Sequence, residues 1–390
     1  MDKKLNILLL ASWYPNTILP NNGNFIQKHA QAIAQNCNVT CLHAISRNQK
    51  NIFEIEINTA NGFDEVVVYY KKIENNTPII GALQKLKRQQ KAYQKGYHKI
   101  ISKTKKIDLV HLNVIFPAGL FALQLKKKLN IPFIITEHWT AFLKNNPIKI
   151  SSVEKYYIKK IAKAAAFICP VSEDLKKAMI KFGINNNYKI IPNVVDTSIF
   201  KFSKERKNND TKRLLHISNL KDEHKNITGI LNTIKKLSEI RSDFTLLIAG
   251  DGDFEAFKKK AINMNIPQGI IEFEGEKTTT EIAELMNQSD YFLLFSNYES
   301  FSVVIAESWL TGLPVITSKC GGLTNQITKE NGVQVAIKNE AELLEKINVI
   351  LSKKNIFDNK LIAQKAKEKY SYQTVSAQFL TLYNTVLKIE

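Results

Sequence analysis

The sequence predicts an α/β protein of two domains, each built on a doubly wound parallel sheet. Short apolar segments alternate with helical segments along nearly the whole chain, which is the pattern of parallel βαβ units. A length of 390 residues is sufficient for two complete cores. Residues 201–213 are charged and nearly free of large apolar side chains, so we predict an inter-domain linker there.

Apolar runs of strand length occur in both halves of the chain. In the first half, the predicted strands are residues 5–11, 39–44, 66–70, 109–112, 133–136, 166–169 and 189–191. In the second half, they are residues 214–217, 245–249, 270–273, 291–295 and 315–317. Helices are predicted between most of them, and ligands of such sheets bind beyond the carboxyl ends of the strands.

The net charge of +19 is unevenly distributed. Residues 1–200 contain 29 Lys and Arg against 12 Asp and Glu, whereas residues 201–390 contain 26 against 24. Such an imbalance indicates that one half faces an anionic partner, for which membrane phospholipid, phosphorylated lipid and nucleic acid are the candidates. A lysine-rich proteome would explain the total charge but not the difference between the halves.

Residues 83–106 contain no acidic residue. Apolar side chains recur in this segment at helical spacing, namely Leu83, Leu86, Tyr93, Tyr97, Ile100 and Ile101. A basic amphipathic helix of this kind either lies on an anionic bilayer or packs its apolar stripe onto its own sheet. Both interpretations remain open from the sequence.

The four cysteines form no C-x-x-C pair and no plausible zinc site. We interpret them as buried thiols in a reducing cytoplasm. No apolar run approaches the roughly 18–20 residues of a membrane-spanning helix. We therefore expect a cytoplasmic protein, with any membrane contact being peripheral.

The most informative segment is residues 296–322. Residues 303–310 are predicted to form a helix that is apolar nearly all round, which is typical of an interior helix. Gly312 suits a left-handed C-terminal cap and Pro314 ends the helix. Glu307 lies within this apolar helix, where burial without a partner would cost several kcal/mol. Glu299 precedes it by eight positions.

Eight helical steps would place these two glutamates about 12 Å apart. Carboxylate pairs that hydrolyse glycosidic bonds lie only about 5–9.5 Å apart, so the spacing better suits one long ligand contacted at two places. Glu299 would meet its reactive end, Glu307 would accept two hydroxyl groups, and the N–H groups of Ser302, Val303 and Val304 would face an anion. Sugar, diphosphate and ribose in that order describe a nucleotide-sugar. Alternatively, this is a core helix whose Glu307 pairs with a neighbouring Arg or Lys.

The segment reads E-S-F-S-V-V-I-A-E-S-W-L-T-G-L-P-V, followed by Gly321-Gly322. It resembles the E-x7-E region of the retaining GT-B glycosyltransferases of family 4, in which E-[SG]-F-G-x4-E-A-x3-G-x-P-V precedes a G-G pair. Ser302 replaces the usual glycine. Because serine is a good N-cap, we expect the turn to survive, with a tighter approach of the backbone to phosphate.

The resemblance implies a metal-independent, cofactor-free enzyme that transfers a sugar from a nucleotide-sugar, with UDP as the expected nucleotide. Glu299 would position the donor sugar and Glu307 the ribose, while Lys225 and the helix amides would stabilise the departing diphosphate. Asn219 occupies the position of the family's arginine and Asn226 that of a glycine. One positive charge is thus missing, and either Lys221 or the helix amides would compensate for it.

In the first half, W-Y-P…G-N-F resembles the family's glycine loop, which places Gly23 over the donor. T-E-H-W follows a predicted strand, and the resemblance assigns His138 to the donor sugar or the acceptor. It also implies domains at residues 1–200 and 201–372, with residues 373–390 forming a closing helix that returns to the first domain. Relatives that glycosylate lipid-linked acceptors favour a saccharide or lipid-linked acceptor, in cell-surface polysaccharide or glycolipid synthesis.

Two other classes of protein remain as alternatives. A nucleotide-sugar 2-epimerase shares the GT-B architecture and would act without an acceptor. A basic nucleic-acid-binding protein would explain the charge, but it would leave Glu307 and the register of the G-x-P-V and G-G motifs unexplained. We therefore expect no nucleic acid among the partners.

Overall fold

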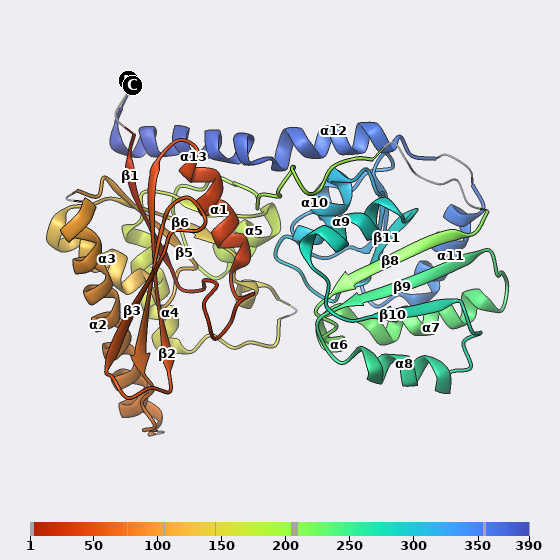
Figure 1. The fold of residues 1–390 in the computed structure, drawn as a ribbon, viewed down its shortest axis with the longest axis horizontal. Coiled ribbons are helices and arrows are strands. Elements are labelled where there is room, and N and C mark those ends of the chain that lie inside the picture. The colour runs from red at the N-terminus through yellow and green to blue at the C-terminus, as the bar shows by residue number, and fades with distance from the viewer. Residues whose placement is uncertain are drawn as a thin grey trace. The chain divides into compact units, whose positions relative to one another are not determined.

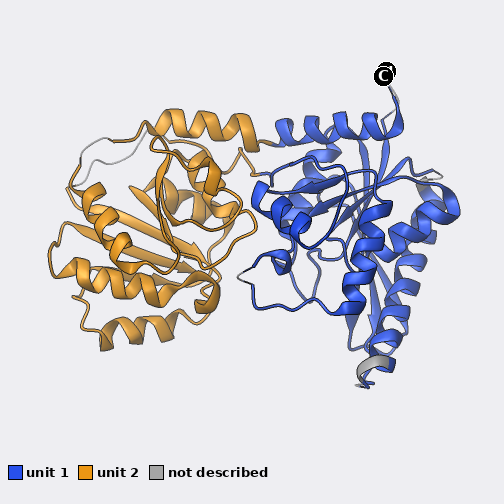
Figure 2. Ribbon diagram, turned by 180° about the vertical axis from the view of Figure 1, so that it is seen from behind, with its two compact units in different colours: residues 1–194, 372–390 blue, residues 195–371 orange. Residues whose placement is uncertain are grey.

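The computed structural model describes residues 4–75, 77–104, 106–144, 146–203, 210–353 and 356–389. The chain forms two compact units (Figure 2). Unit 1 comprises Met1–Val194 together with Tyr372–Glu390, and unit 2 comprises Val195–Ser371. The sequence placed the corresponding boundaries after residues 200 and 372. Residues 204–209 of the predicted linker, as well as Lys105 of the basic segment, lie outside the described residues.

Unit 1 contains a seven-stranded sheet with the order β3-β4-β2-β1-β5-β6-β7 (Figure 1). Its strands are β1 (Asn6–Ala11), β2 (Asn38–Arg47), β3 (Phe53–Asn58), β4 (Asp64–Lys71), β5 (Leu109–Asn113), β6 (Phe133–Glu137) and β7 (Ile168–Pro170). All neighbours pair in parallel except β3, which pairs antiparallel with β4. The order is that of a doubly wound sheet, as predicted, with one antiparallel edge strand.

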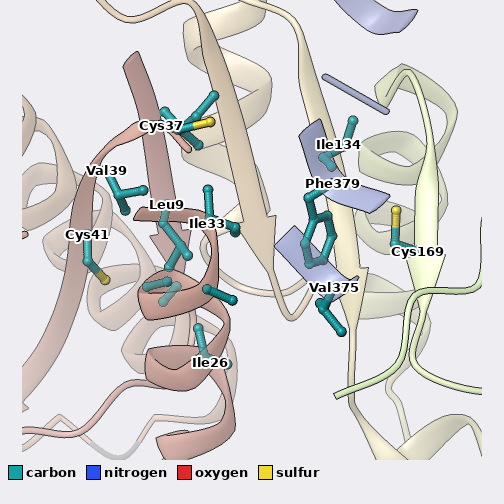
Figure 3. Close-up of a cluster of buried hydrophobic side chains, with 14 of the residues drawn as sticks. Leu9, Ile26, Ile33, Cys37, Val39, Cys41, Ile134, Cys169, Val375 and Phe379 are labelled. Atoms are coloured by element: carbon teal, nitrogen blue, oxygen red, sulfur yellow. The ribbon is translucent and has the colours of Figure 1, made fainter. Parts of the chain in front are cut away.

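The helices of unit 1 bury their apolar sides against this sheet. They are α1 (Asn24–Ala34), α2 (Pro78–Thr104), α3 (Gly119–Leu129), α4 (Ser152–Ala164), α5 (Glu173–Lys181) and α13 (Tyr372–Leu387), with the 3₁₀ turn η1 (Thr140–Phe142). Although α13 is the last helix of the chain, it belongs to the core of unit 1. Figure 3 shows its Val375 and Phe379 among Ile134 of β6, Ile33 of α1 and Cys169 of β7.

Unit 2 contains a six-stranded parallel sheet with the order β10-β9-β8-β11-β12-β13. Its strands are β8 (Lys212–Ser218), β9 (Phe244–Gly250), β10 (Ile271–Glu274), β11 (Tyr291–Leu294), β12 (Val315–Ser318) and β13 (Gly332–Val335). Its helices are α6 (Asp222–Lys225), α7 (Ile227–Ser238), α8 (Phe254–Asn263), α9 (Thr279–Asn287), α10 (Val303–Leu310), α11 (Glu340–Leu351) and α12 (Asn359–Tyr370), with the 3₁₀ turn η2 (Thr324–Gln326). The fold class predicted from the sequence is confirmed.

The sequence analysis was wrong about three strands. It missed the edge strands β3 and β13, since β3 has no fully buried side chain and β13 has one, Val335. It also predicted a strand at residues 189–191, where the structure has a single bridge between Tyr188 and Ile168. Pro192 follows directly and cannot donate a ladder hydrogen bond.

The basic segment after residue 83 is part of α2, and its apolar stripe is divided. Tyr93, Tyr97 and Ile100 are buried, and α2 packs against β2 and β4. The first turns differ, because Ile80 and Leu83 are 56% and 47% exposed. Most of the stripe therefore packs onto the sheet of unit 1. In the described part of the chain, no helix is long and apolar enough to cross a membrane.

Candidate active site

The candidate residues of unit 2 lie at the carboxyl ends of three adjacent strands. The loop after β8 carries Asn219 and leads to Lys225, the loop after β11 carries Glu299 and Ser302, and the loop after β12 carries Gly321. Because β8, β11 and β12 are neighbours in a parallel sheet, these loops emerge at one edge. Such an edge is the usual ligand site of an open α/β sheet.

Lys225 and Glu299 form an ion pair at this edge. Nζ of Lys225 donates to Oε1 of Glu299 at 2.5 Å, and the two side chains are only 12% and 9% exposed. Oγ of Ser296 also donates to Oε1 of Glu299, at 2.9 Å. The carboxylate is thus held by two donors from two different loops.

Glu299 is ionised despite its burial. Burial by itself raises the pKa of this carboxyl group, but the adjacent ammonium group of Lys225 opposes it most strongly, and the pKa of Glu299 lies well below its usual range. An ionised Glu299 is unsuited to donate a proton. It can instead accept hydrogen bonds from the hydroxyl groups of a sugar.

Gly321 of the G-G pair packs directly against Glu299. A Cβ atom added to Gly321 would lie 2.3 Å from Cβ and 2.8 Å from the carbonyl oxygen of Glu299. The φ angle of Gly321 is also positive, at 83°. The close contact between the two residues therefore requires glycine at position 321, which explains why the G-G pair belongs to the same motif as Glu299.

Helix α10 begins at Val303, directly after Ser302. Ser302 has φ 71° and ψ 72°, and its side chain makes no capping hydrogen bond. The expectation that the hydroxyl would cap α10 is thus wrong, although the turn itself is present. A non-glycine residue in this conformation costs about 1 kcal/mol, which explains why glycine suits the position. Val303 and Val304 supply the first amides of the helix, and the first N–H groups of an α-helix have no partner within it.

Glu307 lies in the middle of α10 and is half-buried. The sequence analysis treated it as a fully buried acid, and that premise is wrong. The estimate of about 12 Å between the two glutamates assumed one continuous helix, but Glu299 precedes the helix and only the second half of the interval is helical. The interior character predicted for α10 is confirmed by Ile305, Ala306, Trp309 and Leu310, all of which are buried.

The short helix α6 carries Lys225 at its end. Asn226 follows with φ 53° and ψ 49° and caps α7 by accepting from the amide of Gly229 at 3.3 Å. Asparagine tolerates this left-handed conformation better than most residues, so it replaces glycine here without loss of the turn. Asn219 is half-buried, and its Oδ1 accepts from the amide of Lys221 at 3.4 Å.

Two site residues of unit 2 were not predicted, His224 and Tyr298. Their rings are stacked, with centroids 4.3 Å apart and planes inclined by 7°. Nε2 of His224 lies 3.5 Å from Oε1 of Glu299. Each of them directly precedes a predicted site residue, but the sequence does not show that their rings meet, because the two positions are 74 residues apart.

In unit 1, Gly23 precedes α1 with φ 73°. A Cβ atom here would lie 2.9 Å from the backbone carbonyl group of Trp13, so only glycine allows the loop after β1 to fold back on itself. This loop is also held by Tyr14, whose hydroxyl donates to the buried carboxylate of Glu65 at 2.5 Å. The structure therefore explains the glycine by a close backbone approach.

His138 follows β6 and is buried in unit 1. Its ring lies 4.6 Å from that of Phe25 and 5.5 Å from that of His29, and burial lowers its pKa well below the usual range. The preceding residue, Glu137, was not predicted as a site residue. Its carboxylate accepts from the amides of Ile115, His138 and Trp139 at 2.8–2.9 Å, and burial raises its pKa to about 7.

Unit 1 thus brings together Gly23 and His138, through Phe25 of the glycine loop. Unit 2 brings together Lys225, Glu299 and the loop that leads to Ser302, with His224 and Tyr298 beside them. Val303, Val304 and Glu307 follow on the same helix, and Asn219 lies in the loop before α6. Within unit 2, these residues provide an ionised acid, a cation and free helix amides.

Two family descriptions match adjacent parts of the chain: Glycosyltransferase Family 4 over residues 24–199 and Glycosyl transferases group 1 over residues 197–369. An uncharacterized glycosyltransferase of Methanocaldococcus jannaschii is 27% identical over 327 residues, which are 82% of this chain and 86% of that protein. The alpha-monoglucosyldiacylglycerol synthase of Streptococcus pneumoniae is 25% identical over 247 residues, 58% of this chain and 55% of that protein. A crystal structure of Anabaena HepE in complex with UDP superposes with a TM-score of 0.73 at 17% identity and covers 98% of this chain and 100% of its own. The chain therefore belongs to the group 1 glycosyltransferases of family 4 type and is a glycosyltransferase with the GT-B fold.

Proposed function

We propose that this glycosyltransferase transfers a sugar from a UDP-linked donor to a saccharide or lipid-linked acceptor, with retention at the anomeric carbon and without a metal ion. The observation that carries the proposal is the ion pair of Glu299 and Lys225 just ahead of the amino end of α10. It combines a sugar-directed acid and a phosphate-directed cation in one cluster.

The chemistry follows from charge development at the leaving group. As the glycosidic bond breaks, negative charge grows on the diphosphate. Lys225 and the amides of Val303 and Val304 are preorganised donors for that charge. Glu299, being ionised, accepts from hydroxyl groups of the donor sugar and fixes its orientation.

The identity of donor and acceptor is supported by relatives. The structural neighbour HepE is described in complex with UDP, which supports a uridine nucleotide. The streptococcal relative is named a monoglucosyldiacylglycerol synthase, which supports a lipid-linked acceptor. The exposed apolar residues Ile80 and Leu83 in the first turns of α2, which precede Lys85 and Lys87, would place such an enzyme on an anionic membrane surface.

A panel of nucleotide-sugars scored by thermal shift tests the donor. We expect UDP-sugars to raise the melting temperature more than GDP- or ADP-sugars, and EDTA to leave turnover unchanged. Product analysis without acceptor should show slow hydrolysis that releases UDP and the sugar with its original anomeric configuration. Release of a 2-epimerised sugar would show an epimerase instead, and steeply salt-dependent DNA binding that Glu307→Ala leaves unaffected would favour a nucleic-acid-binding protein.

A further inference from the structure

His224 lies in the last turn of α6, beside Lys225. Its ring stacks on Tyr298, and Nε2 faces the carboxylate of Glu299 at 3.5 Å. The loop after β11 fixes the backbone of this turn, because the amide of Asn297 donates to the carbonyl oxygen of His224 at 2.8 Å and its side chain donates to that of Glu223 at 2.9 Å. The position of the imidazole is thus set by the loop that carries Glu299.

Nε2 of His224 is buried and has no hydrogen-bond partner in the described part of the chain. Its separation from Oε1 of Glu299 exceeds the usual range of about 2.7–3.2 Å for such bonds. A buried donor without a partner costs about 1–3 kcal/mol. A stacked ring that is held in this state at a ligand edge is well placed to bond to a ligand.

The paired groups around the imidazole are one ion pair and one carboxylate that is bound to neutral donors. Lys225 and Glu299 neutralise each other. Asp222 on the same helix accepts from the amide and hydroxyl of Thr228 at 2.8 and 2.5 Å. The pKa of His216 on β8 is lowered to about 4, mainly by burial, so His216 is neutral near pH 7. The charges of Lys225 and Glu299 shift its pKa in opposite directions.

The remaining titratable neighbours are Glu223 on the same helix and Tyr298 on the opposing loop, whose pKa is raised by burial and by Glu223 and Glu299. Neither supplies positive charge. Besides the exposed Lys221 at the start of α6, an incoming diphosphate therefore meets one lysine, and that lysine is already paired. A proton on His224 would add a positive charge next to the paired lysine.

We propose that His224 is a second phosphate-binding cation, which takes up a proton when the diphosphate of the donor binds beside Lys225. This inference rests on the proposed function, because it names a residue for the same nucleotide site. Histidine changes its charge between pH 5 and 8, so donor binding is expected to be linked to proton uptake from solvent. Imidazolium donates through Nε2, which has no hydrogen-bond partner among the described residues.

Calorimetry with UDP and with inorganic pyrophosphate tests this at pH 6 and pH 8, each in two buffers of different ionisation enthalpy. We expect His224→Gln to weaken UDP binding at pH 6 about tenfold and to reduce the proton uptake relative to wild type. His224→Arg should retain the affinity and lose the pH dependence. His98→Gln, at an exposed histidine of α2, is the matched control and should behave as wild type.

Unchanged UDP affinity and proton uptake in His224→Gln would overturn the inference while the proposed function stands. A loss of affinity in Lys221→Gln but not in His224→Gln would overturn it too, since the second charge would then come from Lys221. Thermal melting of each variant separates these outcomes from misfolding. If wild-type protein bound no UDP at either pH, the proposed function itself would be contradicted.

Discussion

Nζ of Lys225 lies 2.5 Å from Oε1 of Glu299, although Lys225 ends α6 and Glu299 lies in the loop after β11. Without a donor, Lys225, which we expect to bind the diphosphate, is therefore paired with Glu299, which we expect to bind the sugar. Donor binding must share Lys225 between the carboxylate and the phosphate. This relationship makes the two residues energetically inseparable.

A double-mutant cycle should measure that coupling. Removing one member of a nearly buried ion pair leaves the other charge uncompensated, so we expect Lys225→Met to lower the free energy of unfolding by about 3 kcal/mol. Glu299→Gln should cost a similar amount, and the double variant should cost much less than the sum. Urea unfolding of the four proteins checks this. Additive losses would mean that the pair is not formed in solution.

The roles proposed for the two glutamates can be separated with a modified nucleotide. If Glu307 accepts from the ribose hydroxyls, wild-type protein should prefer UDP over 2′-deoxy-UDP by roughly tenfold, and Glu307→Ala should abolish that preference. Glu299→Ala is the matched comparison, and we expect it to retain the preference while turnover falls at least a hundredfold. Calorimetry and a donor hydrolysis assay give both readings. A preference that survives in Glu307→Ala would remove the ribose assignment.

The close packing of Gly321 on Glu299 predicts a steric effect that a second glycine can calibrate. Gly321 and Gly269 have nearly the same φ, 83° and 85°, but a Cβ at Gly269 meets nothing within 4 Å. Gly269→Ala should therefore cost only the backbone strain, about 1 kcal/mol. Gly321→Ala should cost about 3 kcal/mol or more and abolish turnover, because Glu299 must shift. Equal losses of stability in the two variants would contradict the packing argument.

The sequence predicted the interior of both sheets because buried parallel strands are continuous apolar runs. Edge strands were missed for the same reason. In β3, glutamates alternate with apolar residues and one face is solvated, so hydrophobicity alone does not mark it. The apolar run of Val303–Leu310 was correctly interpreted as an interior helix, since its composition leaves no polar face.

The candidate site was predictable where a motif fixes the backbone and not where contacts cross the chain. Glu299, Lys225 and Gly321 follow from motif register. His224 becomes visible only when α6 and the loop after β11 are folded together, because its partners Tyr298 and Asn297 are remote in sequence. Likewise, nothing in the letter S at position 302 indicates a left-handed backbone.

The division of the apolar stripe of α2 refines the membrane hypothesis into a prediction. Only its first turns are exposed, at Ile80 and Leu83, next to the basic residues Lys85 and Lys87. We expect Ile80→Ser combined with Leu83→Ser to reduce partitioning onto phosphatidylglycerol vesicles without changing the melting temperature, and raised salt to weaken binding of wild type. Vesicle sedimentation measures this. Ile262→Ser in unit 2, at a residue that is 65% exposed, is the control, and equal partitioning of all three proteins would contradict membrane contact through α2.

Buried neutral histidines predict that unit 1 is sensitive to acid. The pKa values of His29 and His43 in unit 1 are lowered to about 4 by burial, as is that of His216 in unit 2, and burial also holds those of His111 and His138 in unit 1 well below the usual range. Because the unfolded chain binds protons more readily than these folded sites, their contribution to stability is complete above pH 6.5 and is lost as the pH falls towards 4. Glu137 acts in the opposite direction, since its pKa is raised to about 7 and protonation favours its folded form.

Four histidines of unit 1 oppose that one carboxyl group, so the net effect on unit 1 should be a loss of stability on acidification. The three tryptophans allow each unit to be followed separately, since Trp13 and Trp139 belong to unit 1 and Trp309 to unit 2. In Trp309→Phe, fluorescence reports unit 1, and we expect its free energy of unfolding in urea to fall by several kcal/mol between pH 7.5 and 5.5. In the double variant Trp13→Phe with Trp139→Phe, fluorescence reports unit 2, where the lowered pKa of the buried His216 acts and the decrease should be smaller. Exposed imidazoles bind protons equally in the folded and unfolded states and so add no pH dependence to stability. A steeper pH dependence for unit 2 than for unit 1 would therefore show that the histidines of unit 1 are not buried in solution.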